Sequence, residues 1–385
     1  MPKTMTSIMT ITTEEREAIL GAVKDFAENR LAPHALEWDE QHHFPRDVLA
    51  EAGELGLGGI YVSEDVGGSG LSRSDAVAIF EQLAMGDPTM AAYMTIHNMV
   101  AWMIDTHGDD AQREEWLPRL VTMRDLGAYC LTEPGAGSDA AAITTSAIAS
   151  GDEYVLTGVK QFISGGGEAA VYVVMARTGE PGARGITAFL VPGDAEGLSF
   201  GAAEKKMGWN AQPTRQVILD EVRVPASAIL GGLGGGFKLA MSGLNGGRIN
   251  IAACSLGGAQ WAIDRAVRYV HERFTFGEAL AEKQSVVFAL ADMATQLRAA
   301  RALVRDAAQA LDEKAPDAAM QCAMAKRFAT DAGFEIANQA LQLHGGYGYL
   351  HDYGIEKVVR DLRVHQILEG TNEIMRVIIG RHLLG

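Results

Sequence analysis

Residues 217–224 read VILDEVRV, and they are followed by Pro225 and by the glycine cluster GGLGGG at residues 231–236. Short apolar runs bounded by Gly, Pro and Asp are typical of β-strands, whereas Pro225 and the glycines interrupt regular structure. From Phe237 onward the chain has the apolar spacing of helices. The junction therefore predicts that a β-domain ends here and that a helical domain begins.

Upstream of this junction, the runs at residues 171–175 and 186–191 show the same strand-like texture, which starts near Gly127. Strands at this spacing favour a compact sandwich or barrel. The glycine cluster does not fit a dinucleotide-binding turn, because no βαβ unit surrounds it. We predict a middle β-domain over residues 127–236.

The flanking regions carry helical patterns. Thr12 and Glu15 have the spacing of a capping box, and helical spacing returns at residues 76–83 and 90–104. Two apolar stripes follow in the C-terminal part, namely Ile263, Ala266, Val267 and Val270, and then Leu290, Met293, Leu297, Ala300 and Val304. We predict an N-terminal helical domain over residues 1–126 and a helical bundle over residues 237–385, making the chain mainly α.

Composition excludes several classes of function. A formal net charge of −16 and a pI near 5.1 argue against nucleic acid or an anionic membrane as the main partner. No apolar run is long enough for membrane insertion, and the first residues lack a leader pattern. The three scattered cysteines and ten scattered histidines form no metal-binding spacing. We therefore expect a cytoplasmic protein without a metal site.

Two segments have the residues of a ligand-binding loop. Residues 129–139 read YCLTEPGAGSD, and residues 161–167 read QFISGGG. Glycines allow a ligand to approach the backbone, hydroxyls and free N–H groups bind phosphate or ring atoms, and Phe162 can stack on a flat heterocycle. Plain polar turns between strands are the alternative for both segments.

Glu369 lies between the apolar pair Ile367–Leu368 and Gly370, in the string RVHQILEGTNEIMRVIIGR. Loss of solvation raises the pKa of a carboxyl group toward the range useful for a general base. The alternative is that Glu369 merely precedes a helix capped by Thr371. The segment at Ser69 lacks the closing glycine of a nucleophile elbow, which disfavours hydrolase chemistry.

Four strings taken together resemble the acyl-CoA dehydrogenase family along essentially the whole chain: YCLTEPGAGSD, RFTFGEALAEKQ, QLHGGYGYL and RDLRVHQILEGTNEIMR. The resemblance is strongest to the isobutyryl-CoA branch, through GWNAQPTR, LNGGRINIA, LADMATQL and HGGYGYLHDYG. It implies a helical domain, a middle β-barrel and a C-terminal four-helix bundle. Family members are usually homotetramers that bind FAD between the β-domain, the bundle and a neighbouring subunit.

The resemblance also implies site residues. On the isoalloxazine and pyrophosphate side, FAD contacts are expected from Tyr129, Cys130, Leu131, Thr132, Gly137, Ser138, Phe162, Ile163 and Ser164. Across a subunit interface, they are expected from Arg273, Thr275, Phe276, Lys283, Gln284, Gln342, Leu343, His344, Gly345 and Gly346, and after the base from Thr371, Asn372 and Glu373. Substrate contacts are expected from Ser138, Asn245, Gly246, Gly247, Arg248, Gly370 and Arg381, although many relatives carry an acidic residue where Asn245 stands.

The implied reaction removes the α-proton of an acyl-CoA with Glu369 and transfers a β-hydride to FAD. The glutamate of the LEGT string stands where the short-chain and isobutyryl branch places its base. We expect isobutyryl-CoA as substrate, in valine catabolism, and electron-transfer flavoprotein as electron acceptor, with residues 93–102 as candidates for the pocket floor. The alternatives are a butyryl- or 2-methylbutyryl-CoA dehydrogenase, an acyl-CoA oxidase, or a family-derived assembly protein without turnover.

Overall fold

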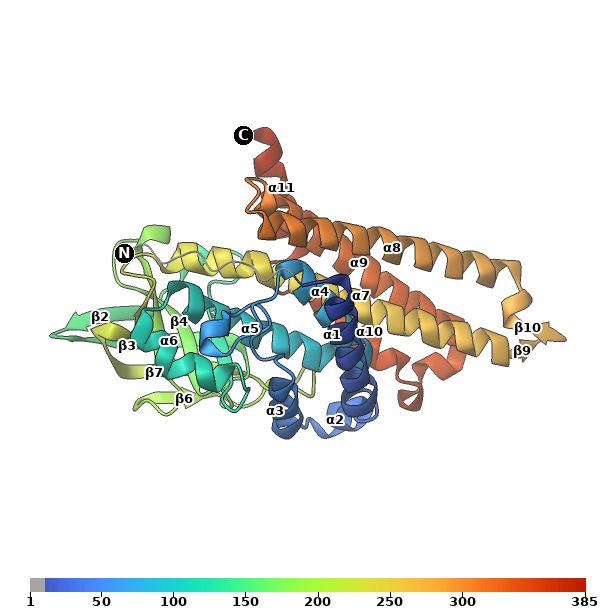
Figure 1. Ribbon diagram of the computed structural model, residues 1–385, viewed down its shortest axis with the longest axis horizontal. Helices are drawn as coiled ribbons and strands as arrows, with labels where there is room; N and C mark the ends of the chain where they lie inside the picture. The colour runs from blue at the N-terminus through green and yellow to red at the C-terminus, as the bar shows by residue number, and fades with distance from the viewer. Residues whose placement is uncertain (1–10) are drawn as a thin grey trace.

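The structure, a computed structural model, describes residues 11–385 in the order helical, β and helical (Figure 1). The first ten residues, which enter the expectation about a leader, lie outside the described part. The N-terminal helices are α1 (Thr13–Phe26), α2 (Ala35–Gln41), α3 (Arg46–Glu54), α4 (Arg73–Gly86), α5 (Pro88–His107) and α6 (Asp110–Leu120).

Side-chain caps mark the N-termini of helices in this region. The predicted capping box at Thr12 and Glu15 is confirmed, and Ser72 with Asp75 forms a second box at the start of α4. Such caps satisfy N–H groups that have no partner within the helix. The predicted helical stretches 76–83 and 90–104 lie within α4 and α5.

The middle region consists of β1 (Gly127–Cys130), β2 (Ser146–Ser150), β3 (Glu153–Ser164), β4 (Val171–Arg177), β5 (Ile186–Pro192), β6 (Leu198–Phe200), β7 (Thr214–Pro225) and β8 (Ile229–Leu230). Their order in the sheet is β6-β7-β3-β2-β4-β5-β8, and β1 pairs with β4 in parallel. The β-domain is confirmed, but a closed barrel is not, because the short end strands β6 and β8 are not paired with each other in the described sheet. A barrel requires that last pairing to remove both edges.

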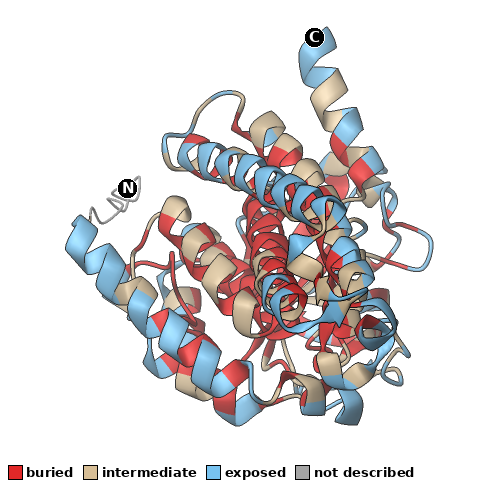
Figure 2. Cartoon of the chain, turned by 90° about the vertical axis from the view of Figure 1, so that its right-hand side faces the viewer, coloured by how far each residue is buried: buried red, intermediate tan, exposed pale blue. Residues whose placement is uncertain are grey.

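The C-terminal region consists of α7 (Gly236–Glu272), β9 (Phe274–Thr275), β10 (Glu278–Ala279), α8 (Gln284–Asp312), α9 (Ala318–His344), α10 (Ile355–His365) and α11 (Asn372–Leu384). The middle of α7 is buried. Figure 2 shows that the buried residues gather in the centre of the molecule and the exposed ones on its outside. A Cβ at Gly257 would lie 2.1 Å from the Glu81 carbonyl oxygen, so glycine lets α4 and α7 approach closely. Within the predicted stripe of α7, Val267 is an exception, because it is exposed.

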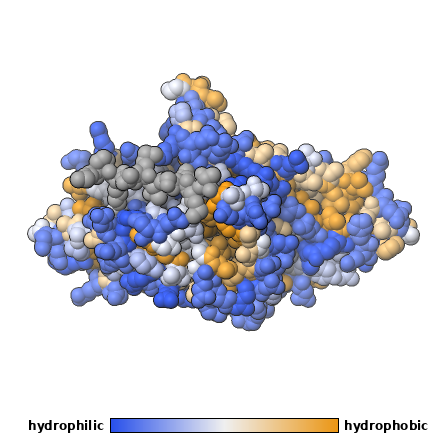
Figure 3. All heavy atoms as spheres, in the orientation of Figure 1, coloured by the Kyte–Doolittle hydropathy of each residue, from blue (hydrophilic) through white to orange (hydrophobic). Residues whose placement is uncertain are grey.

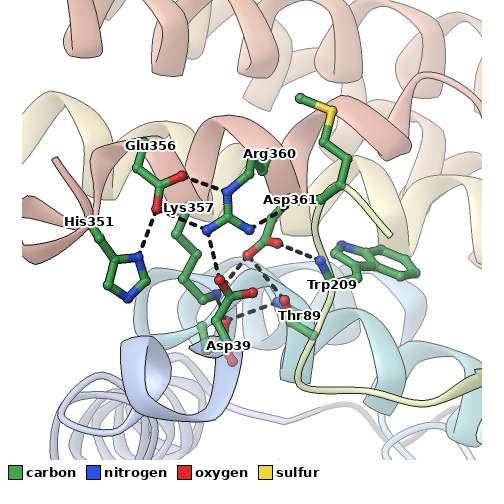
Figure 4. A network of polar contacts seen from close by, with 10 residues as sticks. Asp39, Thr89, Trp209, His351, Glu356, Lys357, Arg360 and Asp361 are labelled. Carbon is green, nitrogen blue, oxygen red and sulfur yellow. Dashed lines mark hydrogen bonds and ion pairs between the residues drawn. The ribbon is translucent and has the colours of Figure 1, made fainter. Parts of the chain in front are cut away.

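A buried polar network joins the three regions (Figure 4). The Lys357 ammonium of α10 donates to Asp87 and Asp361 at 2.7 Å each. Asp361 also accepts from the Thr89 hydroxyl at 3.0 Å and from the Trp209 backbone N–H at 2.7 Å. Buried charges are tolerated when they are paired and hydrogen-bonded in this way. The network thereby fixes α10 against α5 and against the segment before β7.

Arg360, one turn along α10 from Glu356, extends the network. Its guanidinium donates to Asp39 at 2.7 Å, to Glu356 at 2.5 Å and to the Met207 carbonyl oxygen at 3.1 Å. The segment following Met207 therefore has a defined position relative to the C-terminal helices.

No helix in the described part of the chain is long and apolar enough to cross a membrane. The predicted domain boundaries fall at the connections between α6 and β1 and between β8 and α7, where α7 begins at Gly236. These boundary positions stay predictions.

Candidate active site

Glu369 lies in a tight turn between α10 and α11. Its φ is 56° and that of Gly370 is 88°, so two consecutive residues adopt the left-handed region. This conformation is costly for a residue with a side chain, and it is seen where surrounding contacts enforce it. Thr371 then caps α11 by accepting from the Ile374 N–H at 3.3 Å, as predicted. The turn aims the Glu369 side chain at α7.

The Glu369 carboxyl group is desolvated. Its Oε2 is buried without a hydrogen-bond partner. Burial raises the pKa of Glu369 to about 7, and the nearby cations Arg248 and Lys326 oppose that rise. A carboxyl group with such a pKa is matched to general-base work near neutral pH.

Gly247 of α7 makes room for this carboxyl group. A Cβ built there would lie 2.5 Å from Glu369 Oε2 and 2.8 Å from its Cδ. One turn earlier, a Cβ at Gly243 would meet Met103 Cε at 2.1 Å, which shows how closely α5 approaches α7. Of the predicted substrate residues, Gly247 is therefore placed against the base.

Arg248 is buried and lies beside the turn. Its Nη1 donates to Asn245 Oδ1 at 2.7 Å, and its Nε donates to the backbone oxygen of Glu369 at 3.3 Å. The structure places the Arg248 guanidinium in the interior rather than on the helix surface. Asn245 accepts the hydrogen bond that an acidic residue could accept at the same position. Arg248 thus holds the main chain of the base, and Asn245 orients Arg248.

Lys326 of α9 was missed by the sequence analysis. It is fully buried, and its Nζ donates to the Gly370 carbonyl oxygen and to Asn372 Oδ1, each at 2.8 Å. An isolated lysine in a helical pattern carries no signal of such a role. Asn372 is buried as well, so its amide group makes its contacts inside the protein and not on an exposed surface.

Aromatic groups surround the same space. Tyr129 of β1 has a buried hydroxyl without a hydrogen-bond partner, and burial together with the nearby Glu369 raises its pKa well above the usual value. The guanidinium of Arg73 lies 3.6 Å from the ring centre of Tyr61 and 4.9 Å from that of Trp102. The sequence analysis did not single out Tyr61 or Arg73. The site is therefore built from α4, α5, α7, α9, β1, the segment between α3 and α4, and the α10–α11 turn.

Two predicted cofactor segments, 129–138 and 162–164, are held together by a buried ion pair. The Lys160 Nζ donates to Glu133 Oε1 at 2.7 Å and to the Leu131 carbonyl oxygen at 3.1 Å, and neither charged side chain is more than 4% exposed. Glu133 also accepts from the backbone N–H groups of Thr144 and Thr145. This pairing leaves the glycine-rich loop of the first segment at the surface.

Individual side chains of these segments face different ways. Cys130, Leu131 and Ile163 are buried in the core, so only their backbones are available to a ligand. Thr132 and Ser164 are partly exposed, and Gly137 and Ser138 are exposed. Phe162 is 64% exposed with a φ of 59°, which presents its ring outward from β3.

Lys160→Met is expected to lower the free energy of unfolding by about 3–5 kcal/mol, because Glu133 would remain charged without its buried partner. Arg223→Met is a matched control, since Arg223 pairs with Glu153 at 3.3 Å between exposed side chains of the same sheet and such pairs contribute about 0–1 kcal/mol. Urea unfolding followed by circular dichroism measures both. Equal effects would contradict a role of the buried pair in holding the two segments.

The other predicted cofactor residues gather at the far end of the bundle. A single surface pocket is lined there by Arg273, Thr275, Gln342, Leu343, His344, Gly345 and Gly346, among others. Lys283 lies next to it, bonded to Glu278 and 5.7 Å from the ring centre of the fully exposed Phe276. Gln284 is the first residue of α8.

This pocket is distant from the base within one chain. Gln342 follows Lys326 by sixteen residues on the same helix, which corresponds to roughly 24 Å of helix length. Glu373 and Arg381 lie exposed on α11, which projects from the bundle (Figure 1). Arg381 is nine residues beyond Asn372, or about 14 Å along that helix. One chain therefore does not bring all the predicted residues to one cavity.

Comparison with known proteins shows what the chain is related to. Family models described as the N-terminal, middle and C-terminal domains of acyl-CoA dehydrogenase match residues 13–124, 128–222 and 234–384. The chain belongs to the acyl-CoA dehydrogenase family. The resemblance seen in the four sequence strings is thereby confirmed along the chain, and so is the order of an N-terminal helical, a middle β-sheet and a C-terminal helical domain, whereas the implied barrel is not.

The relatives to which the chain is similar are named after different acyl-CoA reactions. The chain is 54% identical to isobutyryl-CoA dehydrogenase, mitochondrial, of Bos taurus over 96% of its own length and 89% of the relative. It is 42% identical to acryloyl-CoA reductase (NADH) of Anaerotignum propionicum, covering 97% and 95%. Among solved structures, butyryl-CoA dehydrogenase of Megasphaera elsdenii superposes with a TM-score of 0.94 at 38% identity, covering 98% and 100%.

Proposed function

We propose that this acyl-CoA dehydrogenase converts isobutyryl-CoA to methacrylyl-CoA, a step of valine catabolism, with Glu369 as the catalytic base. The observation that carries this proposal is the desolvated Glu369 carboxyl group, held by a left-handed turn against Gly247. The 54% identity to a relative named isobutyryl-CoA dehydrogenase supports this choice of substrate.

Glu369 takes the α-proton of the thioester. Its carboxylate becomes a stronger base when substrate displaces the remaining water, because desolvation disfavours the charged form. As negative charge develops on the thioester oxygen, the backbone N–H of the base residue is a suitable donor. Arg248 bonds the carbonyl oxygen of the same residue and so fixes the orientation of this part of the main chain.

FAD is the proposed cofactor, and the described residues fit it. The Tyr129 hydroxyl is buried without a partner, and a Cβ at Gly135 or Gly137 would meet no atom within 4 Å, so the loop is open to a ligand. The exposed ring of Phe162 is available for stacking beside that loop. When bound there, FAD supplies the acceptor for the β-hydride.

The acyl pocket is proposed to be short and wide, since isobutyryl-CoA has two methyl groups on its α-carbon. Of the residues predicted to form its floor, Met99 lies against α7 near Gly243, and the Trp102 ring faces the Arg73 guanidinium. Tyr93 lies elsewhere, packed edge-on against Phe44 at 4.9 Å between ring centres. Met99 and Trp102 are therefore the better candidates.

We also propose a homotetramer in which the pocket at Arg273 and Gln342 completes the cofactor site of a neighbouring subunit. The separation of that pocket from Glu369 within one chain supports this arrangement. Apolar side chains gather over the first half of α8, where Val287 and Phe288 are exposed (Figure 3). Such a patch is typical of protein–protein contacts. Electron-transfer flavoprotein as electron acceptor and a cytoplasmic location complete the proposal.

The substrate assignment is tested by mixing the purified yellow protein anaerobically with isobutyryl-, butyryl- or 2-methylbutyryl-CoA. We expect isobutyryl-CoA to bleach the oxidised flavin fastest, by roughly tenfold or more over 2-methylbutyryl-CoA, which has one extra methylene, and faster than its straight-chain isomer butyryl-CoA. Faster bleaching by butyryl- or 2-methylbutyryl-CoA would reassign the substrate. Rapid reoxidation by air with peroxide release would indicate an oxidase, and failure to take up FAD would indicate a non-catalytic protein.

A further inference from the structure

Lys326 occupies an unusual position for a lysine. Its side chain is fully buried in α9, where burial lowers its pKa to about 8. Two of its three N–H bonds are used, one on the Gly370 carbonyl oxygen and one on Asn372 Oδ1, both at 2.8 Å. Both acceptors belong to the turn that presents Glu369.

The same turn is held by a second set of contacts from α9. The Asn372 amide donates to Thr330 Oγ1 at 3.0 Å and to Asp331 Oδ1 at 2.7 Å. Gln366, at the end of α10, donates to the same Asp331 atom at 2.8 Å. Lys326 therefore belongs to a network that fixes both sides of the α10–α11 connection.

Hydrogen bonding alone does not explain why this residue is charged. A neutral amide donor of similar length could bond the same two oxygens without the cost of burying an ammonium group. The nearby Glu369 is the charge that favours the ammonium form most. A cation at this place favours the carboxylate over the carboxylic acid.

We propose that Lys326 is a positioning residue of the reaction, which holds the Glu369–Gly370 turn against α9 and keeps the Glu369 side chain ionised for proton abstraction. This inference rests on the proposed role of Glu369 as the base. It differs from that role because Lys326 acts through the turn and through its charge, without touching the reacting atoms.

Several groups face Glu369 and determine how far its pKa changes when Lys326 is replaced. Arg248 from α7 and Lys326 from α9 are the cations that favour its carboxylate. Tyr129 from β1 and Tyr61 are neutral phenols within reach of its charge. Removing Lys326 leaves Arg248 as the remaining cation, so the pKa of Glu369 is expected to rise by about one unit rather than to its fully desolvated limit.

Two variants separate charge from hydrogen bonding. Lys326→Gln keeps donors for Gly370 and Asn372 but removes the charge, whereas Lys326→Met removes both. For Lys326→Gln we expect the acid limb of the pH profile of flavin reduction to move up by about one pH unit, with the plateau rate retained within about threefold. For Lys326→Met we expect the same shift and a plateau at least about tenfold lower, because the turn loses its anchor.

A second measurement does not depend on turnover. Infrared difference spectra recorded through a pH titration follow the C=O band of the protonated Glu369, assigned by its loss in Glu369→Gln. The midpoint is expected to move up by about one unit in Lys326→Gln. Lys24→Gln, which removes an exposed lysine of α1, is the control and should leave the midpoint unchanged.

The outcomes distinguish this inference from the proposed function. An unchanged infrared midpoint and acid limb in a folded, FAD-containing Lys326→Gln protein would overturn the role of Lys326. Near-normal flavin reduction in Glu369→Gln would instead overturn the role of Glu369 as base. If Lys326→Met does not fold, the result for Lys326→Gln still decides.

Discussion

Glu369→Gln is expected to lower the rate of flavin reduction by an acyl-CoA on the order of 10³- to 10⁴-fold, because the amide cannot accept the α-proton. The substitution is close in size and adds no bulk next to Gly247. FAD content and acyl-CoA binding are therefore expected to stay near those of the unmodified protein. Anaerobic stopped-flow spectroscopy of the oxidised flavin band measures the rate, and titration of the same band measures binding.

Glu17→Gln provides the matched control, since Glu17 is exposed on α1. It should reduce flavin at the normal rate. A Glu369→Gln protein with a rate within about tenfold of normal would refute the assignment of the base. Loss of FAD from that variant would instead point to a structural role for the carboxyl group.

The same variant should change how stability depends on pH. The folded-state pKa of Glu369 is about 7, above its ordinary value of 4.5, so folding favours the protonated form. The corresponding stability is present below about pH 4.5 and is lost as pH rises through 7. Relative to the unmodified protein, Glu369→Gln should therefore gain up to about 3 kcal/mol of unfolding free energy between pH 4.5 and 8, measured by urea unfolding. A pH-independent difference would contradict the raised pKa.

Gly247→Ala is expected to reduce the rate of flavin reduction by on the order of 10²-fold. The added Cβ would lie 2.5 Å from Glu369 Oε2, which is closer than two non-bonded atoms can approach. Because α7 is buried here, the carboxyl group must move away rather than the helix. A displacement of about 1 Å misaligns the base and the α-hydrogen. The measurement is the single-turnover reduction rate with isobutyryl-CoA.

Gly21→Ala serves as the control for Gly247→Ala. Gly21 is exposed within α1, and a Cβ there would meet no atom within 4 Å. It should leave the rate unchanged and stabilise the protein by about 0.4–1 kcal/mol, since alanine has the better helix propensity. A normal rate in Gly247→Ala would show that the base does not need the position seen in the structure.

Much of the fold is readable from local patterns. The short apolar runs at residues 171–175, 186–191 and 217–224 correspond to β4, β5 and β7, and the helical spacing on both sides corresponds to α-helices. These periodicities are local consequences of which side chains face the core. The predicted closure of the barrel is not confirmed, because closure depends on pairing between end strands that lie far apart in the sequence, which local patterns do not report.

The residues of the candidate site also fall into two groups, those that are neighbours in the sequence and those that only folding brings together. The apolar neighbours of Glu369, the glycine after it and the cap at Thr371 are adjacent in sequence, so they could be predicted together. Lys326, Arg73 and Tyr61 were missed, because they come from α9, α4 and the segment between α3 and α4. Nothing in their own surroundings distinguishes them from ordinary helix or loop residues.

The sequence alone determined the order of helices and strands, the position of the candidate base and the family resemblance, since each depends on neighbouring residues. Only the tertiary structure decided that Gly247 faces the Glu369 carboxyl group and that Lys326 holds its turn. It also decided that the pocket at Gln342 lies away from that turn. The physical reason is that desolvation and charge coupling act through space, and burial brings together groups that the sequence keeps apart.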